Sequence, residues 1–136
     1  MAVIKPHMAY QKNAITTARP EELTLMLYSG LVKFIIQAKK AIEEKQIENA
    51  HKNLVHAQDI VIYLQATLDM NYDISKKLKP LYGYMLRRLV QANLKKDRAI
   101  ADEMLNFAIQ LRDTWDQAMK NARMESLSRT AASGGK

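Results

Sequence analysis

Residues 47–68 read IENAHKNLVHAQDIVIYLQATL, and their apolar side chains recur at alternating steps of three and four positions. The positions in this stripe are Ile47, Ala50, Leu54, Ala57, Val61, Leu64 and Leu68. An α-helix has about 3.6 residues per turn, so these side chains share one face of a helix. A stripe this narrow, without a polar residue in it, is typical of the seam of a helix bundle. The segment therefore needs partner helices from the rest of the chain.

The preceding segment predicts a first helix that begins at Pro20 and ends near Lys45. Proline suits the first turn because its missing N–H would be unpaired there, and Glu21 with Glu22 favours the positive end of the helix dipole. The predicted buried stripe of this helix is Leu23, Leu27, Leu31, Phe34, Ala38 and Ala41. Its spacing of three and four positions matches that of residues 47–68.

Two further helices are predicted after residue 72. The third begins either near Ser75, with Asp73 or Ser75 as its cap and a bend at Pro80, or at about Pro80 itself. The fourth begins at Asp97, whose carboxylate can cap it. The predicted buried positions are Leu78, Leu81, Met85, Leu89 and Ala92 in the third helix, and Ala101, Met104, Ala108, Leu111, Trp115, Ala118 and Ala122 in the fourth.

The connections between these helices are short, which makes helices that follow one another in sequence antiparallel. We therefore predict an all-α fold, an antiparallel up-down-up-down four-helix bundle over residues 20–123. Residues 1–19 are expected to form an N-terminal arm. Residues 124–136 have no apolar periodicity, and we expect a disordered tail there. Four Gly and three Pro leave little turn material for a β-rich domain.

The composition also bears on where the protein works. The chain has no Cys, which removes disulfides and cysteine nucleophiles and is the usage expected in a reducing cytoplasm. Its first residues lack the apolar core of a signal peptide. Its most apolar stretch is broken by Ser29, Gly30 and Lys33 before it is long enough to span a membrane. We therefore expect a cytoplasmic protein without membrane insertion.

Catalytic and metal motifs are scarce in this sequence. Glu48 and His51 match the Glu-x-x-His motif of di-iron bundles once, but no second copy follows and the seam of their helix is aliphatic. The sequence has no Gly-rich phosphate loop and no Gly-x-Ser-x-Gly nucleophile motif. We expect a binding protein with no catalytic residue, no metal and no cofactor.

Positive charge is concentrated in one segment. Residues 72–98 contribute 8 − 2 = +6 to the net charge of +7. On the third helix, the residues away from the seam are Tyr84, Arg88, Gln91 and Lys95, with Arg87 beside them. They form either a solvated basic face or a peptide-binding surface, since Arg donates several fixed hydrogen bonds to carbonyls or carboxylates. Nucleic acid would require more aromatic side chains and a strong salt dependence, so we expect no nucleic-acid partner.

Two other features remain after the seams are assigned. The first helix carries a second apolar row, Leu25, Tyr28, Val32 and Ile36, which is either flanking core or one wall of an exposed groove. In the arm, Tyr10 either docks on the bundle as part of a local lid or belongs to a disordered segment.

Several separate blocks of the sequence resemble the FliS family of flagellar export chaperones, over about residues 9–119. The blocks are Ala9-Tyr10-Gln11, the run PEELTLMLY from Pro20 to Tyr28, Arg87-Arg88-Leu89 with Ala92-Asn93, and Arg112-Asp113-Thr114-Trp115. Each block alone is a weak signal, but their order and spacing together are specific.

The resemblance implies a cytoplasmic helical bundle that binds the disordered C-terminal segment of flagellin, prevents its early polymerisation and delivers it to the flagellar type III export gate. It implies that Tyr10 anchors the arm and that Arg87, Arg88 and Asn93 belong to a third-helix binding face. The expected partner-binding residues are Tyr10, Leu25, Tyr28, Tyr84, Arg87, Arg88, Gln91 and Asn93. We expect a monomer or weak homodimer. The alternative is a non-enzymatic regulatory or structural bundle that homodimerises through the first-helix row.

Overall fold

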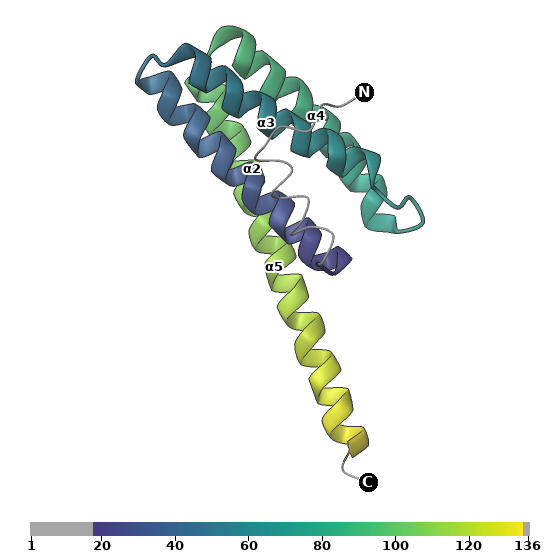
Figure 1. The fold of residues 1–136 in the computed structure, drawn as a ribbon. Helices are drawn as coiled ribbons and strands as arrows, with labels where there is room; N and C mark the ends of the chain where they lie inside the picture. The colour runs from purple at the N-terminus through teal and green to yellow at the C-terminus, as the bar shows by residue number, and fades with distance from the viewer. Residues whose placement is uncertain (1–17, 135–136) are drawn as a thin grey trace.

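The computed structural model describes residues 18–134 and places them in four α-helices (Figure 1). The helices are α2 (Pro20–Glu43), α3 (Ile47–Ala66), α4 (Asp73–Lys95) and α5 (Arg98–Gly134). The packed pairs are α2–α3, α3–α4, α4–α5 and α2–α5, so the helices form a closed ring. Helices that follow one another in sequence run in opposite directions (Figure 1). The predicted all-α, up-down-up-down four-helix bundle is confirmed.

Helix α2 begins at Pro20, as the sequence predicts, and its first turn carries Glu21 and Glu22. Arg19 occupies the N-cap position and makes no side-chain capping hydrogen bond. The helix ends at Glu43, after which Lys45 adopts a left-handed conformation with φ of 59°. This conformation reverses the chain within three residues and starts α3 antiparallel to α2.

Helix α4 begins at Asp73, so the earlier of its two predicted starts is the correct one and Pro80 lies inside the helix. Neither expected cap acts as one, because Tyr72 occupies the N-cap position and makes no capping hydrogen bond. Ser75 is buried instead, and its hydroxyl donates a hydrogen bond of 2.6 Å to the backbone oxygen of Asp69. This bond ties the first turn of α4 to the α3–α4 connection.

The core lies along the axis of the bundle and draws on all four helices. Its largest fully buried side chains are Tyr28, Leu31, Ile35, Leu54, Ile60, Val61, Met85, Leu89 and Met104. Three predicted seam positions are exposed instead: Ile47, Ala118 and Ala122. Ile47 is the first residue of α3, and the two alanines lie in the second half of α5, where they line an open cleft with the first residues of α2. At these positions the apolar pattern continues, but the neighbouring helices leave the side chains open to solvent.

The disordered tail expected from residue 124 is not confirmed, because α5 continues as a helix to Gly134. Local interactions support these turns: Arg129 pairs with Glu125 one turn earlier at 3.5 Å, and the Thr130 hydroxyl donates to the Ser126 backbone oxygen at 2.9 Å. Side chains from Lys120 to residue 131 are exposed. Helix formation here is therefore local and is not driven by burial of an apolar face.

Candidate functional site

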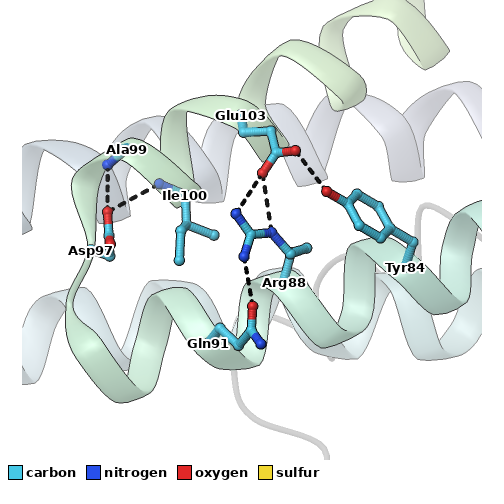
Figure 2. Close-up of polar contacts among 7 residues, drawn as sticks. All are labelled: Tyr84, Arg88, Gln91, Asp97, Ala99, Ile100 and Glu103. Carbon is cyan, nitrogen blue, oxygen red and sulfur yellow. Dashed lines mark hydrogen bonds and ion pairs between the residues drawn. The ribbon is translucent and has the colours of Figure 1, made fainter.

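A network of polar side chains joins α4 to α5 where the sequence predicts a basic binding face (Figure 2). The Tyr84 hydroxyl donates a hydrogen bond of 2.7 Å to Oε2 of Glu103. Arg88 donates from Nε and Nη2 to Oε1 of Glu103 at 3.1 and 2.9 Å, and from Nη1 to Oε1 of Gln91 at 2.7 Å. Three predicted binding residues therefore lie together, and two of them already hold a carboxylate that the sequence analysis did not single out.

The electrostatics of this network favour its charged form. Hydrogen bonds from Tyr84 and then Arg88 hold the pKa of Glu103 below its usual value. The hydrogen bond to Glu103 raises the pKa of the Tyr84 hydroxyl, so the hydroxyl stays protonated at neutral pH. The ion pair is partly exposed and screened by solvent, so its main effect is to fix the geometry between α4 and α5.

The start of α5 sets the position of Glu103 in this network (Figure 2). Oδ1 of Asp97 accepts hydrogen bonds from the backbone N–H groups of Ala99 at 2.9 Å and Ile100 at 3.2 Å. The predicted cap at Asp97 is thus confirmed. Lys96, with φ of 49°, ends α4 in a left-handed conformation immediately before this cap. The tight reversal fixes the register of α5 against α4, and so brings Glu103 opposite Arg88.

Asn93 and Arg87 lie on other parts of the α4 surface. The Asn93 side-chain amide donates a hydrogen bond of 2.9 Å to Nδ1 of His51 on α3, and Nζ of Lys96 donates to Oδ1 of Asn93 at 2.9 Å. Arg87 is exposed, and within residues 18–134 it makes no ion pair or hydrogen bond. Of the cations on the predicted basic face, Arg88 is therefore paired, whereas Arg87 and Lys95 are exposed and open to a partner.

The neighbouring helices α3 and α4 each expose large apolar side chains that lie outside the predicted seams. Ile62 on α3 is 49% exposed, and Leu94 on α4 is 80% exposed, with Val90 one turn before Leu94 also exposed. Arg87, Val90 and Leu94 follow one another at steps of three and four on α4, so they share a side of that helix. We call Ile62, Arg87, Val90 and Leu94 the α3–α4 face. In the sequence, the signal for the α3–α4 face is that its apolar residues lie outside the predicted seams.

The second apolar row of α2 could be either flanking core or one wall of an exposed groove, and its residues differ in burial. Tyr28 and Val32 are buried, Leu25 is half-buried, and Ile36 is 48% exposed. The Tyr28 hydroxyl forms a buried hydrogen bond with the hydroxyl of Tyr82 on α4, across the bundle. The row is thus mainly core, and its exposed end is a single side chain.

A cleft of about 490 Å³ opens at the end of the bundle where α2 begins and α3 ends. Its lining includes Tyr28, Leu68, Leu78, Tyr82 and Trp115. The Trp115 ring meets that of Tyr28 edge-on at 6.4 Å between centroids, and its Nε1 donates to the backbone oxygen of Glu21 at 2.8 Å. This apolar cleft lies apart from the Tyr84–Arg88 network, so the structure does not bring all the predicted binding residues together.

The remaining expectations concern Tyr10, metals and membranes. Tyr10 lies outside the described residues. Within residues 18–134, no group of three or more His, Asp or Glu side chains is arranged to hold a metal ion. No helix in that part of the chain is both long and apolar enough to cross a membrane.

Comparisons with known proteins agree with the fold and with the sequence blocks. The sequence pattern of the family described as "Flagellar protein FliS" matches residues 3–122. The flagellar secretion chaperone FliS of Bacillus subtilis (strain 168) is 44% identical over 125 residues, which are 92% of this chain and 94% of the relative. That of Vibrio cholerae serotype O1 is 32% identical over 115 residues, 80% and 85% of the two chains. A solved structure titled as a flagellar chaperone from bacteria has a TM-score of 0.70 at 18% identity, covering 86% of this chain and 99% of its own, and shows the same fold.

Proposed function

Because the chain belongs to the FliS family of flagellar proteins, we propose that it is a cytoplasmic export chaperone for flagellin. It binds the disordered C-terminal segment of flagellin, prevents premature polymerisation and delivers the client to a component of the flagellar type III export gate. It acts without catalysis or cofactor, as a monomer or weak homodimer.

The observation that carries this proposal is the exposure of large apolar side chains on the α3–α4 face. Ile62, Val90 and Leu94 are exposed, whereas the apolar seams of the same two helices are buried in the core. A disordered client that becomes helical on binding presents apolar residues at steps of three and four, which pack against such a surface. Arg87, which lies among them, is free to donate hydrogen bonds to carbonyl or carboxylate groups of the client.

The other expected binding residues take two roles in this proposal. Gln91 and Asn93 lie next to the α3–α4 face and contribute polar contacts, while Tyr84 and Arg88 act through Glu103 by holding α5 against α4. The second contact region is the end cleft, with Tyr28 in its lining and Leu25 near it on α2. We propose that residues 1–16, with Tyr10 as the anchor, compete with the client for this cleft.

Calorimetry with a peptide that spans the C-terminal segment of flagellin tests the role of the α3–α4 face. Leu94→Asp should weaken binding by about 10-fold to 100-fold, because burying a leucine contributes about 1.5–3 kcal/mol. Ile62→Asp should act in the same direction. Ile36→Asp is the matched control, since Ile36 is exposed to the same degree as Ile62 but lies on α2.

Equal losses in all three variants, or none, would contradict the placement of the client on this face. The homodimer alternative has its own measurement, because an exposed apolar surface also suits a second copy of the chain. Sedimentation showing a tight dimer, together with no affinity for the flagellin segment, would replace the chaperone proposal with that alternative.

A further inference from the structure

The connection between α3 and α4 forms an exposed apolar tip at one end of the bundle (Figure 1). Its large side chains are Met70, Tyr72 and Ile74, and all three are exposed, with Tyr72 at 64% and Ile74 at 55%. Tyr72 precedes α4 and Ile74 is its second residue, so the three lie within five positions. Tyr72 and Ile74 also line one side of the cleft at this end of the bundle, and all three side chains keep exposed apolar surface for a partner.

Three lysines follow the tip on the first two turns of α4. Lys76, Lys77 and Lys79 are all exposed. Lys77 and Lys79 make no ion pair or hydrogen bond within residues 18–134, and Lys76 approaches Asp73 only at 3.9 Å. Asp69 and Asp73 are the acidic side chains of the same stretch, so the three lysines leave a positive excess next to the apolar tip.

We propose that this tip docks onto an anionic lipid surface. The apolar side chains enter the headgroup region, and the lysines contact the lipid phosphates. Tyrosine and lysine both suit this boundary, because each combines an apolar body with a polar end that stays hydrated. Lysines close to an anionic leaflet are attracted to it, and this attraction falls off within a Debye length.

The mixture of side chains favours lipid over an acidic protein. An acidic protein surface would pair with the lysines and leave the exposed apolar side chains in water, whereas an anionic lipid interface accepts both. The exposed apolar residues occupy positions 70–74, and the lysines follow within positions 76–79. This order is expected if residues 70–74 enter the lipid headgroup region and the lysines lie closer to water. The inference does not depend on the identity of the chaperone's client.

Co-sedimentation of the full chain with vesicles tests the proposal. The vesicles contain equal parts of phosphatidylglycerol and phosphatidylethanolamine, and vesicles of phosphatidylcholine alone serve as the neutral comparison. We expect binding to the anionic vesicles and weak or no binding to the neutral ones. The double variant Lys77→Gln, Lys79→Gln should bind about 30-fold more weakly, since each lysine near the surface contributes about 1 kcal/mol.

Matched controls exist at the opposite end of the bundle. Lys40 and Lys52 are exposed, make no ion pair within the described residues, and line a cleft between the end of α2 and the start of α3. Their double replacement by Gln changes the net charge by the same amount and should alter binding by less than about twofold. Ile74→Ser should weaken binding about tenfold, whereas Ile47→Ser, at a site 52% exposed at that opposite end, should not.

Three results would overturn the proposal. Equal losses for the two lysine pairs would show diffuse attraction of a basic protein to the vesicles. Unchanged binding of Ile74→Ser would show that the tip stays out of the interface. Absence of binding to anionic vesicles would leave the tip to an acidic protein surface.

Discussion

The buried pair of Tyr28 and Tyr82 allows a double-mutant cycle in which the coupling free energy between the two hydroxyls has a definite expected sign. Their hydroxyl groups hydrogen-bond to each other across the core, and each side chain is 2% exposed. Burial raises the pKa of both hydroxyls, so both are protonated at neutral pH. Tyr28→Phe or Tyr82→Phe alone removes one hydroxyl and leaves the other buried without its partner.

Each single substitution should lower the free energy of unfolding by about 1–3 kcal/mol, the cost of an unsatisfied buried polar group. The double variant removes both hydroxyls, and its loss should be under about 1 kcal/mol. The double variant should therefore be more stable than either single variant, with a coupling of at least about 1 kcal/mol. Urea unfolding followed by circular dichroism measures all four proteins.

Tyr63→Phe is the control, because Tyr63 is exposed and its hydroxyl makes no hydrogen bond within residues 18–134; its effect should stay within about 0.5 kcal/mol. If the losses of Tyr28→Phe and Tyr82→Phe simply add, the hydroxyls are not coupled. If both are near zero, water from the adjacent cleft satisfies the remaining hydroxyl. Either result would refute the buried pair.

Two further predictions concern α4 and its contact with α5. The pKa of Glu103 is lowered in the folded protein by Tyr84 and Arg88, so this stabilisation is present above the ordinary glutamate pKa and is lost as pH falls through the folded pKa. Glu103→Gln should therefore be less stable than the parent at pH 7 in urea unfolding, and the difference should shrink on acidification; a gap that widens in acid would contradict the network. Pro80→Ala should raise the free energy of unfolding by about 1–2 kcal/mol, because Pro80 lies inside α4 and cannot donate to the backbone oxygen of Lys76. A lower melting temperature for Pro80→Ala would show that the helix requires the proline.

Helix positions and faces could be predicted because they depend on nearby residues. The apolar spacing of residues 47–68 placed Leu54, Val61 and Leu64 in the core, where they lie. The carboxylate of Asp97 caps α5 as expected. These features arise from hydrogen bonds and side-chain directions within one or two turns, which the sequence records directly.

The same periodicity misled at the helix ends. Ile47 and Ala122 continue their stripes but are exposed, because a stripe does not indicate where the neighbouring helix stops. After residue 124 the sequence has no apolar stripe, and the disordered tail expected there is not confirmed. A helix that packs against nothing needs no stripe, and α5 continues there through local contacts.

The sequence predicts which residues belong to the candidate site better than it predicts the contacts that they make. Tyr84 and Arg88 are among the predicted partner-binding residues, and in the structure both bind Glu103, whereas Arg87 beside them is exposed. The apolar residues of the α3–α4 face lie outside the predicted seams, so periodicity does not single them out. The sequence shows that a residue is off the core, but exposure also depends on the neighbouring helix.

The sequence by itself determined four antiparallel helices, the start of α2 at Pro20, the cap at Asp97 and, through its separate blocks, the family. Only the tertiary structure decided which side chains meet across the bundle. Glu103 lies 15 positions from Arg88 and 19 from Tyr84, and Tyr28 lies 54 positions from Tyr82. Such contacts depend on the rotation and axial shift of one helix against another. Packing of the whole core sets both quantities, and no local pattern in the chain encodes them.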